Sequence, residues 1–491
     1  MTTPATTQLD ASGRRGIVLY LAAFGAVLVL MALVGALMRA AQAGIVTLSP
    51  SLFYSFMTAH GIAMVGIAGL GGASILWYYL RQHVTLTTSV LYLNLICFLL
   101  GAVILLGGIF VGGFATGWTF LYPLPQHSSG QWGPGAAAAY LGGLLLIGAG
   151  FLIFYLDVLR GVRARFGSLG RAMGWPQLFA RSSAEPPPAT VVAATVASIV
   201  NVLALLTGAT ILVLELIAVF NNGFALDPLL AKNLTYFFGH VFINAAIYQS
   251  VIAIYEVLSR DTGRPWKASR PFLIAWAATL ALVLAVYPHH FLMDFVMPRW
   301  ILVMGQVLSY MSGFPVLLAT AYGVLTIIRR SGIRWSLSSS LLVLSAFGWA
   351  AGVIPAIIDS TIVVNAVMHN TLWVPGHFHF YIILGQTAMV LAFANDLADQ
   401  GRTAPLSAMD RATFWLYAAG GLGFVAVFLY SGQFGVPRRY AAYLPEWVGL
   451  AKLGALFGLA AALGLLLLVV RFFRRIGSVL AGPDQSLVGS R

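Results

Sequence analysis

Long apolar runs constrain this chain more than any other feature. About twelve stretches of roughly 20 to 30 residues are nearly free of charge, so each is long enough to cross a bilayer as a helix. Only 8% of the 491 residues are charged, whereas a soluble globular protein has about 25%. The sequence therefore predicts an all-α, polytopic membrane bundle with about twelve spans, at 16–38, 52–80, 88–114, 135–159, 190–220, 234–258, 271–292, 299–328, 336–358, 370–395, 412–432 and 447–471.

The segments between these spans are short. The longest connections, 115–134 and 160–189, are too short to form a second folded unit, so residues 1–491 are expected to be one transmembrane domain. The start of the chain is polar and the first apolar run is long enough to stay in the bilayer, which argues against a cleaved signal peptide.

Basic residues follow alternate ends of the spans. One side collects Arg14, Arg15, Arg81, Arg160, Arg163, Arg165, Arg171, Arg181, Arg260, Arg264, Lys267, Arg270, Arg329, Arg330, Arg334, Arg402, Arg411, Arg471, Arg474 and Arg475. The other side holds only Arg39, Lys232, Arg299, Arg438, Arg439 and Lys452. The positive-inside rule then predicts a prokaryotic cytoplasmic membrane protein with both termini in the cytoplasm. The net charge of +13 is spread over many short loops, which disfavours nucleic-acid binding.

Six histidines fall at one depth in this topology. Each lies on the order of 10 Å inside the outer boundary, counted at 1.5 Å per helical residue. They are His60, His240, His289, His290, His377 and His379. One histidine in a span is commonly an isolated polar residue, but six at a shared level indicate metal ligands, because such groups are costly in hydrocarbon.

The spacing of these histidines divides them into sets. His289 and His290 project about 100° apart on a helix, so with His240 they can form a three-histidine site that keeps an open position. His377 and His379 project about 200° apart. One of them can therefore bind a metal that faces the three-histidine site. The other can bind a separate metal, as in a haem, together with His60. Neutral imidazole suits copper, iron and zinc, and is a common axial ligand of haem.

Several motifs resemble the large catalytic subunit of haem-copper oxidases. They are His60-Gly61, Gly117-Trp118-Thr119, Gly239-His240, Pro288-His289-His290, Trp373-Val374-Pro375-Gly376-His377-Phe378-His379 and Pro437-Arg438-Arg439, and they run through nearly the whole chain. The sequence His369-Asn370-Thr371 is most similar to that of the B-type branch.

This resemblance implies a role for each motif. His60 and His379 would ligate a low-spin haem, and His377 would ligate a high-spin haem. The copper ligands would be His240, His289 and His290. Arg438 and Arg439 would pair with haem propionates, with His369 and Asn365 nearby. Asp294 is expected to hydrogen-bond a ligand histidine or to mark the end of its span.

One departure from the family bears on the substrate. Oxygen-reducing members carry a cross-linked tyrosine, usually one turn after the first copper histidine, where this chain has Asn244. In the C-type branch the tyrosine follows the histidine pair by three residues, where this chain has Met293. Tyr248 and Tyr287 match neither position.

The missing tyrosine favours NO as the substrate. Cleaving O2 in one step takes four electrons, of which the two metals supply three and the tyrosine the fourth. Reducing two NO to N2O and water takes two, and Asn244 could donate a hydrogen bond to a reacting oxygen. We therefore expect a nitric oxide reductase. One alternative is a terminal oxidase that reduces O2 to water with electrons from cytochrome c or quinol, with Tyr248, Tyr287 or another donor in place of the missing tyrosine. Another alternative is a transporter whose histidines relay protons.

The proton path of B-type relatives is also altered. Tyr255 remains, but 315–319 lacks the expected hydroxyls. A rerouted path could use Tyr248, Tyr255, Glu256, Ser309, Ser312 and Thr320. Asn365 replaces an aspartate near a haem propionate, which predicts weak or no proton pumping.

Cofactors and electron donors complete the expectation. We expect two haems and one copper ion, with non-haem iron disfavoured because Asn244 stands at a glutamate position of the iron-containing NO reductases. Zinc is disfavoured because a haem must lie opposite the site. Cys97 is the only cysteine, so the chain has neither a Cys-x-x-Cys-His haem attachment nor a dinuclear copper site. Electrons should come from a small subunit with dinuclear copper or cytochrome c, or from quinol.

Overall fold

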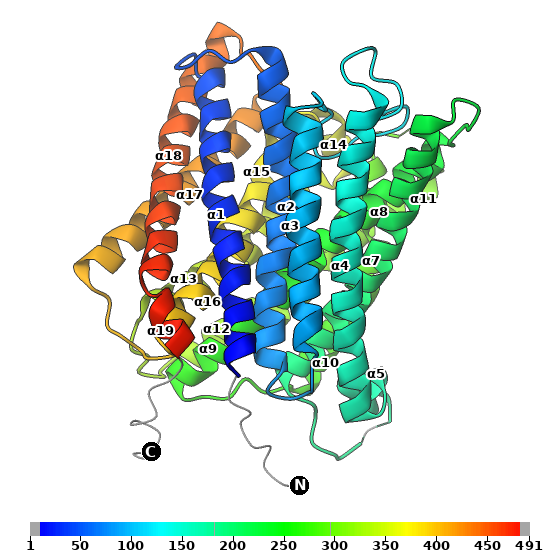
Figure 1. The fold of residues 1–491 in the computed structure, drawn as a ribbon. Coiled ribbons are helices and arrows are strands. Elements are labelled where there is room, and N and C mark those ends of the chain that lie inside the picture. The colour runs from blue at the N-terminus through cyan, green and yellow to red at the C-terminus, as the bar shows by residue number, and fades with distance from the viewer. Residues whose placement is uncertain (1–9, 181, 295, 482–491) are drawn as a thin grey trace.

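Figure 1 shows a bundle of long helices in a computed structural model that describes residues 10–180, 182–294 and 296–481. Twelve helices within these ranges are long and apolar enough to cross a membrane, which confirms the predicted all-α bundle. The unbroken ones are α1 (Ala11–Gln42), α2 (Pro50–Leu80), α3 (Thr88–Phe110), α4 (Pro134–Phe166), α7 (Ala189–Phe220), α13 (Leu337–Asp359), α17 (Ala408–Gln433) and α18 (Pro445–Arg474). The two termini, 1–9 and 482–491, for which a cytoplasmic location is predicted, lie outside the described residues.

Four spans are interrupted, which the hydropathy pattern did not predict. They are α8 (Pro228–Ser250) with α9 (Ile252–Thr262), α10 (Arg270–Ala285) with the 3-10 turn η1 (Tyr287–Phe291), α11 (Arg299–Val316) with the π-helix η2 (Leu317–Ala321) and α12 (Tyr322–Ile328), and α15 (Trp373–His379) with the π-helix η3 (Phe380–Thr387) and α16 (Ala388–Ala398). Pro288 in η1 and Pro315 in α11 lack the N–H that an α-helix needs, which accounts for two of these breaks. Shorter helices α5 (Leu169–Ala172), α6 (Trp175–Phe179), α14 (Ile362–Met368) and α19 (Ile476–Ala481) lie in connections or at the end.

Capping residues fix where several spans begin. The side chains of Asp10, Ser49 and Asp227 each accept a hydrogen bond from a main-chain N–H in the first turn of the helix that follows. Proline stands in the first turn of α2, α4, α8, α10 and α18, where its missing N–H costs nothing.

Glycine allows α17 to approach both of its main partners. A Cβ on Gly432 would lie 2.1 Å from the main-chain nitrogen of Trp373 in α15, and one on Gly420 would lie 2.4 Å from that of Ala461 in α18. Both obstacles are backbone atoms, so no side-chain movement could relieve them. α17 therefore fixes the position of α15, the helix that carries two of the predicted ligands.

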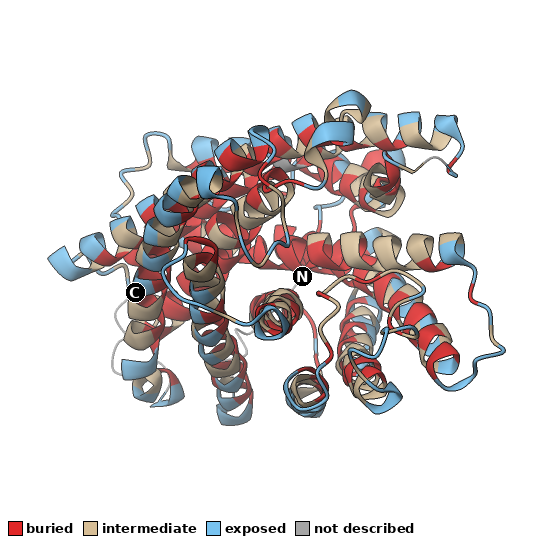
Figure 2. Ribbon diagram, turned by 90° about the horizontal axis from the view of Figure 1, so that it is seen from above, coloured by how far each residue is buried: buried red, intermediate tan, exposed pale blue. Residues whose placement is uncertain are grey.

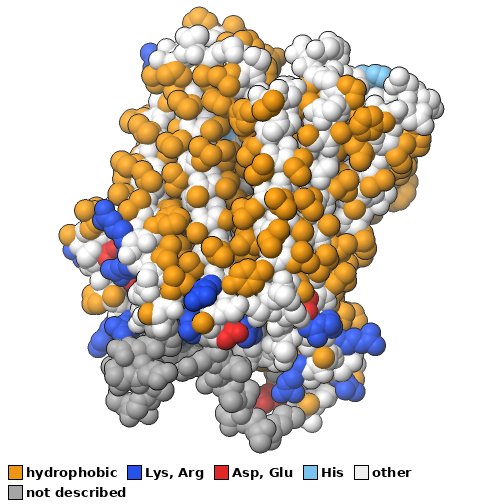
Figure 3. Space-filling model, in the orientation of Figure 1, with side chains coloured by type: hydrophobic (Ala, Val, Ile, Leu, Met, Phe, Trp, Pro, Cys, Tyr) orange, Lys and Arg blue, Asp and Glu red, His pale blue; other side chains and the backbone are white. Residues whose placement is uncertain are grey.

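The flank of the bundle is apolar, and its charged side chains lie mostly at the ends. Figure 2 shows buried residues facing the interior, and Figure 3 shows hydrophobic side chains over the flank with most Lys and Arg at the lower end, where α1 begins. At that end Arg260 binds Asp396 at 2.6 Å, and Arg471 binds Asp399 at 2.9 Å and Asp410 at 3.1 Å. Basic side chains therefore lie mostly at one end of the bundle, and the cytoplasmic location of that end stays a prediction.

Candidate metal centre

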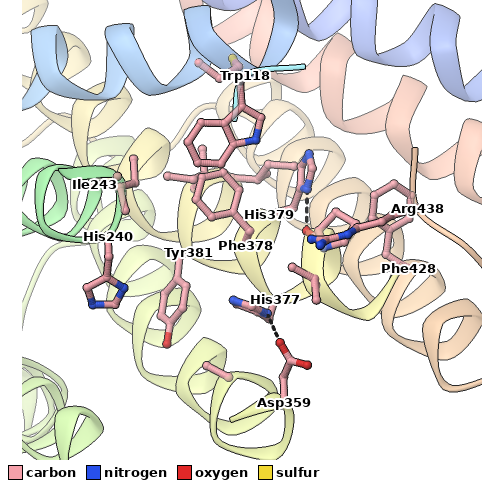
Figure 4. Close-up of a pocket in the computed structure, with 18 of the residues that line it drawn as sticks. Trp118, His240, Ile243, Asp359, His377, Phe378, His379, Tyr381, Phe428 and Arg438 are labelled. Atoms are coloured by element: carbon pink, nitrogen blue, oxygen red, sulfur yellow. Dashed lines mark hydrogen bonds and ion pairs between the residues drawn. The ribbon is translucent and has the colours of Figure 1, made fainter. Parts of the chain in front are cut away.

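A single interior cavity of about 480 Å³ is lined by all six predicted histidines. Its walls come from connecting segments and from α1, α2, α8, α10, η1, α11, α13, α14, α15, η3, α17 and α18. Figure 4 shows His377 and His379 leaving α15 in different directions, with His240 across the cavity. The structure thus brings together residues that are more than 300 positions apart in the sequence.

Three of these histidines form one cluster. His240 Nδ1 and His290 Nε2 lie 3.2 Å apart, and His289 Nε2 and His290 Nε2 also lie 3.2 Å apart. All three candidate ligand atoms fall within 4.8 Å of one another. A tetrahedral ion with bonds of about 2.0 Å separates its ligands by about 3.3 Å, so the cluster fits one small transition metal.

A second pair of histidines faces across the cavity. The rings of His60 and His379 are nearly parallel, at 18°, with centroids 6.4 Å apart. His60 Nδ1 is 2.8 Å from the Met31 carbonyl oxygen, and His379 Nδ1 is 2.6 Å from that of Pro375. A ring whose Nδ1–H donates to a carbonyl presents its Nε2 lone pair to a metal. The spacing leaves room for one iron with a bond of about 2 Å to each ring, so this pair fits the two axial positions of a haem.

His377 stands apart from that pair, on another side of α15. Its ring contacts Tyr381 edge-on at a centroid distance of 6.2 Å, and its Nδ1 lies 4.0 Å from Asp359 Oδ2. Both His377 and Tyr381 line the cavity. A histidine free of the three-residue cluster and of the facing pair fits a single axial ligand of a second haem.

Two arginines lie at the rim of the cavity. Arg438 and Arg439 both line it, and Arg439 Nη2 donates to Thr119 Oγ1 at 3.1 Å. Burial and the neighbouring Arg439 lower the pKa of Arg438 to about 10. Burial and Arg438 also lower the pKa of His369 to about 4, so this histidine is neutral at pH 7. The two guanidinium groups are suited to bind acidic haem substituents.

Asp294 has a different partner from the one expected. Its carboxylate forms an ion pair with Lys232 and accepts a hydrogen bond from the Val296 N–H at 3.1 Å. Although burial raises the pKa of Asp294, the hydrogen bond from Lys232 helps to bring it below its usual value. Asp294 therefore neutralises a cation of α8 rather than orienting a histidine.

Asn244 lies against His240, the first of the three predicted copper ligands. Its Nδ2 donates to the His240 carbonyl oxygen at 2.8 Å and lies 3.3 Å from His240 Nε2, while Nδ1 of that ring lies 3.2 Å from His290 Nε2. Asn244 also lines the cavity. Its nearest partner is thus a ligand of the predicted copper, and a hydrogen bond to substrate stays a prediction.

The predicted proton path is only partly assembled. Tyr248, Ser309 and Ser312 line the cavity, and Tyr255 Oη lies 3.4 Å from Thr320 Oγ1. Glu256 instead accepts a hydrogen bond from the Thr190 hydroxyl of α7. Tyr287, considered as a substitute tyrosine, donates to Asn233 Oδ1 at 3.2 Å.

Three residues of the site were missed by the sequence reasoning. Asp359 is the last residue of α13 and directly follows the predicted span 336–358, and a carboxylate at that edge was a signal. Tyr236 stacks on His290, with ring centroids 5.0 Å apart at 22°, and its place one turn before His240 could have found it. Arg39 is only 3% exposed and lines the cavity with its guanidinium 4.8 Å from the Phe428 ring. In the sequence Arg39 falls among the charges outside the predicted spans, so its burial was not predicted.

The chain is similar in sequence to known proteins. Residues 15–466 match the family described as Cytochrome C and Quinol oxidase polypeptide I. The chain is 25% identical over 430 residues to cytochrome c oxidase polypeptide 1 of Halobacterium salinarum, covering 83% of this chain and 69% of that protein. It is 25% identical over 280 residues to cytochrome c oxidase subunit 1 of Thermus thermophilus, covering 53% of this chain and 50% of that protein.

A solved structure shows the same fold. A heme-copper terminal oxidase dimer superposes with a TM-score of 0.78, over 96% of this chain and 84% of that chain. The sequence identity is 20%, so this likeness concerns the fold alone.

Proposed function

The chain belongs to the cytochrome c and quinol oxidase polypeptide I family, and from this premise we propose that it is a terminal oxidase subunit that reduces O2 to water. Two relatives named above are cytochrome c oxidase subunits, which supports O2 as the substrate. The sequence alone favours NO, whereas the named relatives support O2 more than NO.

The observation that carries the proposal is the division of six histidines within one cavity. The cluster of His240, His289 and His290 has the spacing of copper ligands, while His60 and His379 face each other across the width of one iron. His377 is left as the axial ligand of a second haem. When bound, the two haems and the copper would supply electron transfer and the binding positions for a diatomic gas.

The protein's own groups would orient these cofactors and control their surroundings. Main-chain carbonyls hold the rings of His60 and His379, and Arg438 and Arg439 are placed to bind propionates. Phe424 and Phe428 pack edge-on against His379 at 5.5 Å each and keep that side of the cavity apolar. An apolar wall strengthens electrostatic contacts inside the site.

Reduction of NO is the second candidate, and Asn244 is the observation that favours it. The side chain beside His240 Nε2 is an amide, which cannot supply the electron and proton that a phenol can. Two-electron reduction of NO to N2O does not need that donor, whereas cleavage of O2 would take its fourth electron from Tyr248, which lines the cavity, or from another donor.

Delivery of electrons and protons is part of the same proposal. The single cysteine leaves no site here for dinuclear copper, so a small subunit carrying dinuclear copper or cytochrome c, or a quinol, would supply electrons. Tyr248, Tyr255, Thr320, Ser309 and Ser312 remain the candidates for proton entry, and Glu256 is a candidate at the Thr190 contact.

The two activities are separated by measuring both on one preparation. The purified, haem-loaded complex is given excess electron donor, and O2 uptake is compared with anaerobic NO consumption and N2O formation. We expect rapid O2 uptake and little N2O. Rapid N2O formation with slow O2 uptake would show NO reduction instead, and the absence of both activities in fully haem-loaded protein would contradict both proposals.

A further inference from the structure

We propose that Asp359 is a positioning residue that accepts a hydrogen bond from His377 Nδ1 and so sets the electronic properties of the haem iron on that histidine. The inference rests on the proposed function, in which His377 ligates the high-spin haem. No step of the sequence reasoning gave Asp359 a role.

The three haem-type histidines differ in what faces their Nδ1 atoms. For His60 and His379 it is a main-chain carbonyl, at 2.8 Å and 2.6 Å. For His377 it is a carboxylate, with Asp359 Oδ2 at 4.0 Å, as Figure 4 shows. His377 Nδ1 is buried and has no hydrogen-bond partner among the described residues, so Asp359 faces a donor that is otherwise unsatisfied.

Asn365 holds the Asp359 carboxylate in this orientation. Its Nδ2 donates to the main-chain oxygen of Asp359 at 2.7 Å and lies 3.3 Å from Oδ1. Both residues are buried, at 2% and 8% exposure for Asn365 and Asp359. With Oδ1 facing the amide, Oδ2 is the oxygen that is left for His377.

The chemistry follows from the strength of the acceptor. A carboxylate accepts a shorter and stronger hydrogen bond than a peptide carbonyl does, at about 2.8 Å, so the ring and carboxylate need to approach by about 1 Å. Such a bond fixes the proton on Nδ1, aims the Nε2 lone pair at the iron and makes the imidazole a stronger electron donor. A stronger axial donor stabilises the oxidised iron, so Asp359 should lower the reduction potential of this haem but not that of the haem on His60 and His379.

The test measures the iron–histidine bond rather than turnover. Resonance Raman spectra of the reduced protein report the iron–histidine stretching frequency of the high-spin haem, and redox titration gives the potentials of both haems. In Asp359→Asn we expect the stretching frequency to fall and the high-spin potential to rise, with the low-spin potential unchanged. Asp359→Glu should restore both values toward those of the wild type.

Asp157→Asn is the matched control. Its side chain is 10% exposed, against 11% for Asp359, and it accepts hydrogen bonds from Thr87 outside the cavity. It should leave both spectra and both potentials unchanged. Asn365→Ala, which releases the carboxylate without removing it, should shift the frequency in the same direction as Asp359→Asn but by less.

The outcomes separate this inference from the proposed function. A wild-type band that disappears in His377→Gly but does not move in Asp359→Asn would overturn the role of Asp359 and leave the haem assignment standing. A wild-type protein without a histidine-ligated high-spin haem, or a band that survives in His377→Gly, would overturn both. If Asp359→Asn does not accumulate, an unchanged frequency in Asn365→Ala together with Asp359→Glu overturns the inference.

Discussion

The ring nitrogens of the metal centre have separate partners, so single substitutions should separate its parts. The three-histidine cluster comes from α8 and η1, whereas His60 and His379 come from α2 and α15. Loss of one cluster ligand therefore need not disturb the facing pair. This independence is a property of individual residues and can be tested one side chain at a time.

Replacing His289 should empty the copper position selectively. In His289→Ala we expect the copper content per haem to fall at least about tenfold, because only two ligands remain. The absorption of the low-spin haem should persist. Elemental analysis and reduced-minus-oxidised spectra measure both, with His83→Ala as the control since His83 lies in the turn after α2 and does not line the cavity. Copper retained at the wild-type level would exclude His289 as a ligand.

Residue spacing was sufficient to find the histidines but not their surroundings. All six predicted ligands line one cavity. They could be predicted because their common depth and helical periodicity are visible in the sequence. Asp359 was not found, because the connection 360–372 turns back and brings the end of α13 beside α15, and no sequence periodicity encodes that turn. For Asp294 the sequence offered a bond to a histidine or the end of a span. It could not predict the contact with Lys232, because that contact depends on how α8 packs beside η1.

At the scale of elements, the contact of α17 with α15 is the one that most directly positions ligands. Trp373 begins α15, and Gly432 near the end of α17 lies against its backbone. Hydropathy predicts both helices but gives no information on their separation. It also could not predict η1, η2 and η3, because the apolar runs continue through the breaks.

Adding a methyl group at this contact should loosen both haems. In Gly432→Ala we expect a loss of stability of about 1 to 3 kcal/mol, because the new Cβ meets backbone that cannot move aside. Haem content should fall with it, since α15 carries His377 and His379. Thermal unfolding in detergent and haem-to-protein ratios check this, against Gly449→Ala in α18, where a Cβ meets nothing within 4 Å. Equal behaviour of the two variants would contradict the role given to Gly432.

At the scale of the whole molecule, the basic end of the bundle predicts its orientation. Lys and Arg side chains gather where α1 begins, and α19 lies at the same end (Figures 1 and 3). The number of spans and their order follow from the sequence, because length and apolarity decide them. The arrangement around one cavity does not, because it depends on side-chain packing between distant spans.

Reporter fusions should locate the two ends of the bundle. Alkaline phosphatase is active only where its disulfides form, outside the cytoplasm. We expect an inactive reporter at the C-terminal end of the chain and an active one inserted between α7 and α8, within 221–227. The reverse pattern would contradict the predicted orientation.

The cavity also sets a time order for biogenesis. Its wall includes His60 in α2 and Ala461 in α18, so an early and a late span of the chain both enclose it. These two residues are about 400 positions apart, which at roughly 5 to 20 residues per second corresponds to about 20 to 80 s of synthesis. During that interval the histidines already synthesised line a cavity that is not yet enclosed. If haem and copper bind as proposed, they would therefore enter late or be held by assembly factors until α18 closes the wall.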